Sequence, residues 1–159
     1  LKWVESSARQ VAKYSKGHTI IVEKSTVPVK TAELIKEILM NSENESDFDK
    51  KSFSVLSSPE FLAKGIAIKD LEKTYRVLIG GEDYRVINID EIYINWIPEE
   101  KILLTNIWSS ELSKLIANAF LAQRLSSINS ITALCESTGN KIDEVIRAIG
   151  HHTRIGIKS

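Results

Sequence analysis

Short apolar runs and longer amphipathic stretches alternate along the first two thirds of the chain. The short runs lie at 19–22, 53–56, 76–79 and 101–104. The first of these runs, 19–22, is β-branched throughout, which is typical of a buried strand in a parallel sheet. Between them, apolar residues at helical spacing predict helices over 1–16, 28–40 and 84–97. Strands that alternate with helices predict an α/β fold with a parallel sheet. Gly80 and Gly81 then serve as a strand-to-helix turn.

The segment Trp108–Gly139 has a different pattern, with no proline and a glycine only at its end. We expect one helix of about 30 residues, roughly 45 Å long, because each residue adds about 1.5 Å. Asn106 or Ser109 can cap its start, and Glu111 suits the positive end of its dipole. Its apolar residues point in nearly every direction, which predicts burial on most sides. A last helix follows over 142–149.

This change of pattern predicts a boundary near residue 106. Residues 1–106 would form the α/β part, and 107–159 an all-helical part. Residues 41–52 are polar and rich in turn formers, so we expect a loop there. The chain starts in what looks like the middle of a helix and without an initiator Met, so we expect it to be an excerpt of a longer protein.

Composition narrows the class of protein. Hydrophobic residues make up 43% of the chain and charged residues 26%, which is globular. Lys+Arg and Asp+Glu both number 21, and this balance argues against a nucleic-acid partner held by a basic surface. No apolar run approaches the roughly 18 residues of a membrane helix, so we expect no membrane partner. Cys135 is the only cysteine, which favours a reducing, cytoplasmic location.

Two predicted strand ends carry candidate chemistry, because ligands bind beyond the carboxyl ends of strands in open parallel sheets. Ser25 and Thr26 follow the first strand, and their hydroxyls, with the next helix N-terminus, could bind phosphate, an amide or water. An ordinary helix cap is the alternative. Glu60 lies between Pro59 and two apolar residues, where poor solvation would suit acid/base work. A cap or a surface acid is its alternative.

On the long helix, Lys114 and Asn118 are four residues apart and therefore share a face. A cation and an amide on a mostly buried helix need polar partners, from the protein or from a ligand. The alternative is a lysine whose packed stem carries its head to solvent. Cys135 has apolar neighbours, which predicts a packed thiol rather than a nucleophile. His18, His151 and His152 lack the spacing of a metal motif, and no GxGxxG loop occurs.

Four stretches resemble one family nearly end to end. They are EKSTVPVKTAE (23–33), SSPEFLAKGIAIKDL (57–71), RVLIGGED (76–83) and LLTNIWSSELSKLIANAFLAQRLSSINSITALCESTG (103–139). They resemble the UDP-glucose/GDP-mannose dehydrogenase family in its eukaryotic form. This resemblance implies the C-terminal part of a Rossmann-like sheet domain, followed by a helical central domain. It also implies NAD-dependent oxidation of the C6 hydroxyl of UDP-glucose to a carboxylate in two steps, by a homo-oligomer that associates through the helical domain.

The resemblance also implies roles for single residues. Glu60 matches the acid/base glutamate that serves hydrolysis of a covalent thioester. Lys114 and Asn118 match the residues that stabilise the C6 oxygen. Thr26 matches the threonine that organises water and cofactor, flanked along the NAD pocket by Ser25 and Val27. The positions expected to line the sugar nucleotide also include Phe61, Leu62, Ala63 and an arginine that reaches across a subunit interface, Arg154.

Departures from the family pattern leave alternatives open. Lys64 stands where relatives carry an acidic residue near the cofactor, and Ile157 where they usually carry a polar one. The 82–98 segment looks several residues short. The dinucleotide fingerprint, the nucleophilic cysteine and the UDP-binding domain would lie outside these residues, so we expect the isolated chain to be inactive. A truncated, non-catalytic assembly or regulatory module and a dehydrogenase for another nucleotide sugar are the rival hypotheses.

Overall fold

A computed structural model describes residues 1–41, 51–62, 65–81 and 92–152. The chain divides into two compact units, residues 1–116 and 117–159. The helices are α1 (Lys2–Tyr14), α2 (Thr31–Met40), α3 (Ala67–Glu72), α5 (Ile107–Thr138) and α6 (Ile142–Gly150), with a short 3-10 helix at Glu99–Lys101. The strands are β1 (His18–Glu23), β2 (Ser52–Ser57), β3 (Val77–Gly80) and β4 (Ile102–Thr105).

The four strands form one sheet in the order β1-β2-β3-β4. β1 and β2 are parallel, with His18 opposite Ser52 and Glu23 opposite Ser57, and β3 and β4 are also parallel. β2 and β3 meet antiparallel through the single pair Ser57 and Gly80. The α/β class is confirmed, but the expectation of a purely parallel sheet is wrong. An apolar run reveals a strand and not its direction, which the connections and packing decide.

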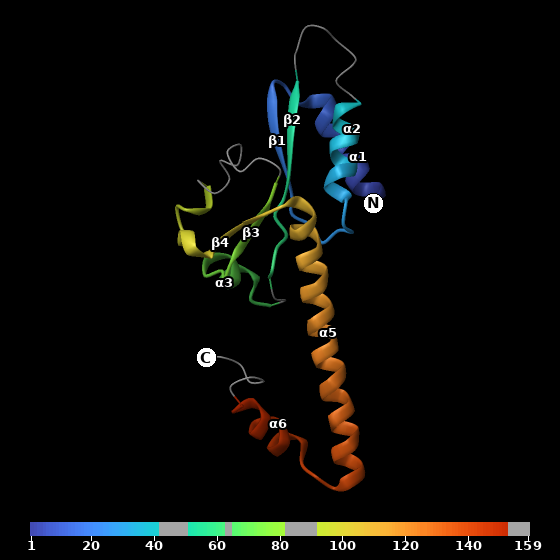
Figure 1. Ribbon diagram of the computed structural model, residues 1–159, viewed down its shortest axis with the longest axis vertical. Coiled ribbons are helices and arrows are strands. Elements are labelled where there is room, and N and C mark those ends of the chain that lie inside the picture. The colour runs from blue at the N-terminus through green and yellow to red at the C-terminus, as the bar shows by residue number, and fades with distance from the viewer. Residues whose placement is uncertain (42–50, 63–64, 82–91, 153–159) are drawn as a thin grey trace. The chain divides into compact units, whose positions relative to one another are not determined.

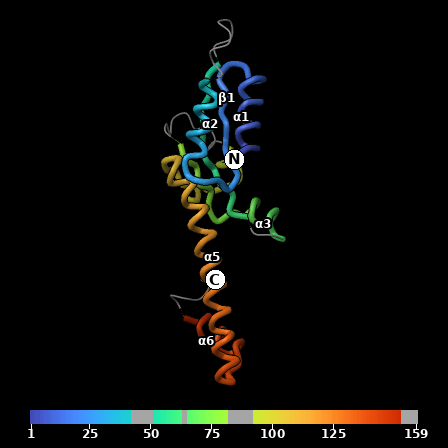
Figure 2. The backbone as a smooth tube through the Cα atoms, turned by 90° about the vertical axis from the view of Figure 1, so that its right-hand side faces the viewer, coloured from blue at the N-terminus to red at the C-terminus, as the bar shows by residue number. Residues whose placement is uncertain are grey.

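Two helices cover the β1–β2 part of the sheet. α1 packs against α2, and α2 packs against β2; Figures 1 and 2 show the two helices side by side along these strands. Ala8 and Ala12 of α1 and Ala32 of α2 are buried in this layer, and such small side chains allow a close approach of helices. Ile35, Leu39 and Val55 fill the core beneath them. A second core, around β3, consists of Leu56, Val77, Ile79 and Ile97.

The four strands and the helices α1, α2, α5 and α6 lie where the pattern predicts them. Most of the predicted 41–52 loop and the first part of the predicted 84–97 helix fall outside the described residues. From Ile92 the chain is helical for two residues and then turns. α3 was not predicted. It has only six residues and buries none of them, so it leaves no periodic apolar signal.

The start of α5 lies very close to the sheet. Asn106 caps the helix, because its Oδ1 accepts the N–H of Ser109 at 2.8 Å. A Cβ on Gly80 would lie 2.5 Å from the Cβ of Ser110, so only glycine leaves room for the helix here. The interpretation of Gly80 as part of a simple turn is therefore wrong. Gly80 is the last residue of β3, and it sets the approach of α5 to the sheet.

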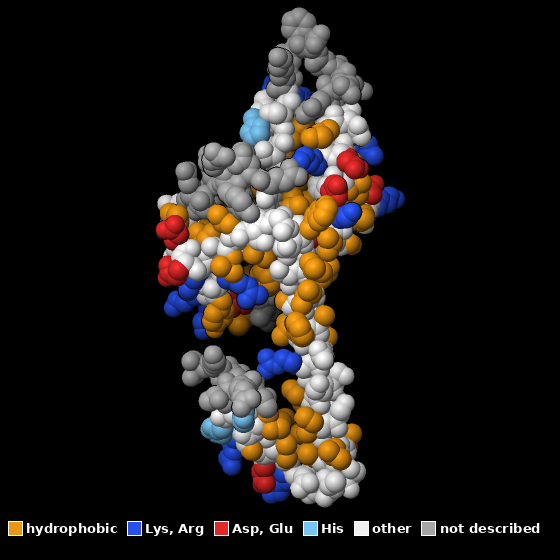
Figure 3. Space-filling view, in the orientation of Figure 1, with side chains coloured by type: hydrophobic (Ala, Val, Ile, Leu, Met, Phe, Trp, Pro, Cys, Tyr) orange, Lys and Arg blue, Asp and Glu red, His pale blue; other side chains and the backbone are white. Residues whose placement is uncertain are grey.

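Most of α5 contradicts the prediction of burial on most sides. Its large apolar side chains are exposed over nearly its whole length, and Figure 3 shows them along the helix surface. The exposed ones are Trp108, Leu112, Ile116, Phe120, Leu121, Leu125, Ile128 and Leu134. Periodicity shows that a helix is apolar all round, but not what covers it. Cys135 is buried, as expected of a packed thiol, and Gly139 ends the helix with φ 73°.

Candidate functional site

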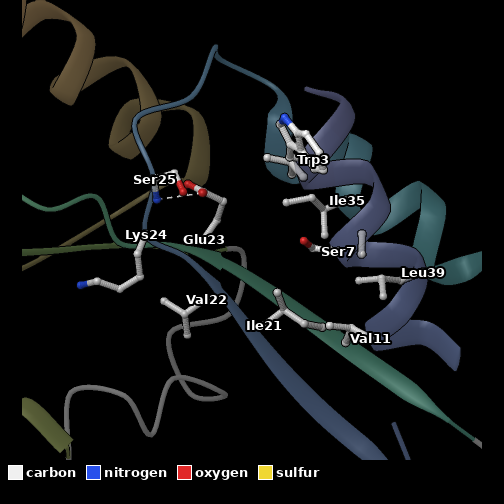
Figure 4. A pocket seen from close by; sticks show the side chains of 12 residues that line it. Trp3, Ser7, Val11, Ile21, Val22, Glu23, Lys24, Ser25, Ile35 and Leu39 are labelled. Atoms are coloured by element: carbon white, nitrogen blue, oxygen red, sulfur yellow. Dashed lines mark hydrogen bonds between the residues drawn. The ribbon is translucent and has the colours of Figure 1, made fainter. Parts of the chain in front are cut away.

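The loop after β1 carries the first group of predicted residues. Ser25 and Thr26 are exposed, whereas Val27 is buried. Glu23, the last residue of β1, is also buried, and its Oε1 accepts the N–H of Ser25 at 2.8 Å (Figure 4). The backbone oxygen of Glu23 accepts the N–H of Ser58, at the end of β2, at 2.8 Å. One residue therefore joins the Ser25 loop to the neighbouring strand end.

The N-terminus of α2 is already occupied by a carboxylate. Glu111 is only 2% exposed, and its two oxygens accept the N–H groups of Lys30 at 2.7 Å and Ala32 at 2.8 Å. The prediction that this helix end is free to bind phosphate is therefore wrong. So is the assignment of Glu111 to the dipole of its own helix, because its side chain caps α2 instead. The side chains of Ser25 and Thr26 are exposed on this loop.

Glu60 lies in an exposed ion pair. Its Oε1 is 3.5 Å from Nζ of Lys24, and its side chain is 44% exposed. The expectation of a poorly solvated carboxyl group is therefore wrong. Lys24 also donates a hydrogen bond to the hydroxyl of Tyr93 at 3.0 Å, and its Nζ lies 5.6 Å from the centre of that ring. Lys24 thus links the Glu60 carboxylate to the hydroxyl of Tyr93.

Phe61 connects Glu60 with the long helix. Nζ of Lys114 lies 5.0 Å from the centre of the Phe61 ring, and Cζ of Arg76 lies 4.3 Å from it. Both cations are within the range of a cation–π interaction. Lys114 is half-buried, and among the described residues it has no ion pair with a carboxylate. The ammonium group of Lys114 therefore lies on the ring of Phe61 without a neutralising carboxylate from the described residues.

The structure gives fewer contacts for the other predicted site residues. Leu62 is half-buried next to Phe61, and both line a cavity of about 30 Å³ together with Glu60 and Arg76. Lys114 does not line that cavity. Asn118 is exposed, one turn beyond Lys114 on α5, and belongs to the second unit. Three positions, Ala63, Lys64 and Arg154, lie outside the described residues.

Four residues of this region were not singled out from the sequence: Glu23, Lys24, Arg76 and Tyr93. Lys24, Arg76 and Tyr93 contact partners that are distant in the chain, so no local pattern marks them, whereas Glu23 contacts Ser25 two residues on. Glu23 alone had a weak signal, since a carboxylate at the end of a β-branched run is unusual for a buried strand. Arg76 begins an apolar run and reads as an ordinary flanking charge.

Burial raises the pKa of the Glu23 carboxyl above its ordinary value. Hydrogen bonds from the backbone and side chain of Ser25 lower this pKa, the nearby Glu111 carboxylate raises it, and Lys24 lowers it. The net effect is upward because removal from water outweighs the hydrogen bonds. The other oxygen, Oε2, is buried and has no hydrogen-bond partner in the described part of the chain. The same holds for Oγ of Ser57, the residue paired with Glu23 in the sheet.

Two larger cavities lie in the first unit. One of about 410 Å³ lies between α1, α2 and β1, and its lining includes Trp3, Glu23 and Ser25 (Figure 4). The other, of about 620 Å³, lies between α2, β2 and the start of α5, and none of the predicted site residues line it. Within the described ranges, no group of His, Cys, Asp and Glu side chains could hold a metal ion. No described helix is long and apolar enough to cross a membrane.

Two family models match this chain and together cover most of it. Residues 1–97 match the NAD binding domain of the UDP-glucose/GDP-mannose dehydrogenase family. Residues 108–159 match the central domain of the same family. The boundary predicted at 106 falls between these two matches. The division of the chain into spatial units lies ten residues later because the first turns of α5 pack into the α/β unit.

Individual proteins agree with the family models. The chain is 56% identical to a UDP-glucose 6-dehydrogenase of Caenorhabditis elegans, over 99% of this chain and 34% of that protein. It is 55% identical to one of Gallus gallus, over 99% of the chain and 32% of the relative. The chain thus spans about a third of the length of these curated relatives. The solved UDP-glucose dehydrogenase of Pyrobaculum islandicum superimposes with a TM-score of 0.87 at 32% identity, covering 98% of this chain and 36% of that one. The chain belongs to the UDP-glucose/GDP-mannose dehydrogenase family.

Proposed function

We propose that this chain is the central part of an NAD-dependent UDP-glucose 6-dehydrogenase, which oxidises UDP-glucose to UDP-glucuronate in two steps. The observation that carries the proposal is the placement of Lys114 on the ring of Phe61, directly after Glu60. A cation can stabilise the negative charge that develops on a hydroxyl under oxidation, and a carboxylate can serve as acid/base in hydrolysis of an acyl intermediate. Identity of more than half the residues to UDP-glucose 6-dehydrogenases supports the choice of reaction.

The residues have separate tasks in this proposal. Lys114 stabilises negative charge on the C6 oxygen, because its ammonium group rests on an aromatic face and is not neutralised by a carboxylate among the described residues. Glu60, oriented by Lys24, acts as acid/base in the hydrolytic step. Asn118 donates its amide to the same oxygen. Phe61, Leu62, Ala63 and Arg154 contact the sugar nucleotide.

The residues present fit NAD at the loop after β1. Thr26 and Ser25 are exposed at a strand end and offer hydroxyl groups, with Val27 buried behind them. The neighbouring helix end does not fit a phosphate, because Glu111 holds its N–H groups. Thr26, flanked by Ser25 and Val27, would therefore hold a part of the cofactor other than its phosphates, and Lys64 lies nearby in sequence. When bound, NAD would accept one hydride in each of the two oxidation steps, so two NAD molecules would be reduced for each UDP-glucose.

The exposed apolar side chains of α5 support assembly. Phe120, Leu121, Leu125 and Leu134 are each more than 60% exposed, and such surfaces mark interaction sites in stable proteins. We infer that copies of the whole protein associate through the helical domain, as a homo-oligomer in the cytoplasm. Sedimentation velocity of the full-length protein tests this, and a monomer at micromolar concentration would contradict it.

Two rival functions predict different results. A dehydrogenase for another nucleotide sugar is less favoured, because the solved GDP-mannose dehydrogenase of Pseudomonas aeruginosa shares only 23% identity and shows the fold alone. A non-catalytic module would self-associate and would catalyse no reaction. The test is NADH formation by the full-length protein with UDP-glucose, with GDP-mannose as the comparison substrate. We expect two NADH per UDP-glucose consumed, and none from the 159-residue chain.

The residue assignments are tested in the same assay. Lys114→Ala should lower kcat by roughly 100-fold or more, since one lost electrostatic contact in a transition state is worth about 3 kcal/mol. Glu60→Gln should slow the hydrolytic step and spare the two hydride transfers that precede it, which a single-turnover burst of two NADH per active site would reveal. Exposed Lys73 offers the matched control, and Lys73→Ala should leave both steps unchanged. Full activity of Lys114→Ala would remove Lys114 from the mechanism.

A further inference from the structure

A buried carboxyl group controls the loop that carries Thr26. Glu23 is 7% exposed, and its Oε1 accepts the N–H of Ser25 at 2.8 Å. Its backbone oxygen accepts the N–H of Ser58 from the neighbouring strand end. The loop is otherwise exposed at Ser25 and Thr26. On its strand side, the loop is therefore held by Glu23 through Ser25, while buried Val27 anchors it on the other side of Thr26.

Fold stability alone does not explain a carboxylate at this position. Burial disfavours its charge, and the carboxylate of Glu111 lies close enough to disfavour it further. Among the described residues, Lys24 is the cation that favours its charge, and Lys24 is also paired with Glu60. The second oxygen, Oε2, is buried and adds no hydrogen bond to the described residues.

We propose that Glu23 is a positioning residue for the cofactor: its Oε1 fixes the Ser25 amide and so holds Thr26 in the geometry that binds NAD. This rests on the function proposed above. Ser25 follows as a structural residue, because its N–H group points to Glu23 and is not free for a ligand (Figure 4). Thr26 is then the residue of this loop that meets the cofactor.

The test is calorimetric binding of NAD to the full-length protein, with variants at Glu23. Glu23→Ala should raise the Kd for NAD about tenfold, the effect of losing one hydrogen bond that orders a binding loop. Glu23→Gln keeps an oxygen acceptor for Ser25 and should restore the Kd to within about threefold of wild type. The KM for UDP-glucose should change by less than about twofold in both, because the loop does not hold the sugar.

Glu37→Ala is the matched control. Glu37 is an exposed carboxylate on α2, and the variant should bind NAD as wild type does. An unchanged Kd in Glu23→Ala would overturn the proposal, and so would an equal loss in Glu23→Gln, because then the acceptor oxygen is not what matters. A merely structural role would raise both substrate constants together, which also overturns it. If Glu23→Ala does not fold, Glu23→Asp replaces it, since its shorter reach should also weaken NAD binding.

The two proposals fail in different ways. Absence of UDP-glucose-dependent NADH formation in the wild-type protein contradicts the proposed function. Binding of NAD alone, compared between wild type and the Glu23 variants, still measures the role of Glu23. Conversely, an active wild type with an unchanged Kd in Glu23→Ala overturns only the role of Glu23.

Discussion

The two ends of α5 reverse the usual rule of burial. At its start, the polar residues Ser110 and Glu111 are 0% and 2% exposed. Further along, the apolar residues Phe120 and Leu125 are 61% and 62% exposed. The difference arises from partners: the first turns lie against Gly80 and the N-terminus of α2, whereas the later turns have no such cover in the described chain. Burial along this helix therefore follows what packs against it rather than the hydrophobicity of each residue.

The largest effect should come from removing the buried acid. Glu111→Ala leaves the N–H groups of Lys30 and Ala32 without a partner, so we expect the free energy of unfolding to fall by about 3 kcal/mol. Urea denaturation of the 159-residue chain measures this loss. Glu136→Ala is the control, because Glu136 is exposed on the same helix. A loss below about 0.5 kcal/mol would contradict the capping role of Glu111.

The next effect concerns the close approach of helix and sheet. Gly80→Ala puts a methyl group where Ser110 lies 2.5 Å away, which should lower the free energy of unfolding by about 2 kcal/mol. Gly150→Ala is its matched control, since a Cβ there meets nothing within 4 Å. The double change of Gly80→Ala with Ser110→Gly should not restore stability, because the new Cβ would still lie 2.9 Å from the backbone oxygen of Asn106 and the hydrogen bond from Ser110 to Ser57 would be lost. Equal stability of Gly80→Ala and wild type would show that α5 can shift without cost.

A smaller, pH-dependent effect on stability should come from Glu23, the other buried acid of the first unit. The pKa of Glu23 is raised by burial, so the folded chain binds its proton more tightly than the unfolded chain does. The stability that this gives is fully present below the ordinary glutamate pKa and is lost as the pH rises through the folded-state pKa. Glu23→Gln should therefore lose less stability than wild type between pH 4 and pH 8. Thermal unfolding across that range measures the difference, and parallel curves would contradict it.

The smallest effect on folding should come from the exposed end. Leu125→Ser removes an apolar side chain that is already 62% exposed, so the free energy of unfolding of the chain should change by less than about 0.5 kcal/mol. The same change in the full-length protein should weaken self-association, which sedimentation velocity detects. Arg124→Ser is the neighbouring control. A large loss of stability in the isolated chain would mean that Leu125 is packed within it.

Residues with a local or periodic signal could be predicted from the sequence. The short apolar runs predicted the strands, and the Asn106 cap and Gly139 predicted the limits of α5. Strand-end position and helix spacing made Glu60 and Lys114 site candidates, and the resemblance then assigned them roles. The contacts that organise the site could not be predicted. Lys24 with Glu60, Arg76 with Phe61, and Glu111 with the start of α2 join residues between 15 and 81 positions apart, which no local pattern encodes.

The sequence by itself determined the α/β class, the long helix and the membership of a dehydrogenase family, because spacing and local chemistry are written along the chain. Only the tertiary structure decided that β3 runs antiparallel to β2, that Glu60 stands in an exposed ion pair, and that Glu111 serves another helix. The physical reason is the same in each case. Direction, solvation and partner choice depend on which surfaces meet, and those surfaces are brought together only when distant segments pack.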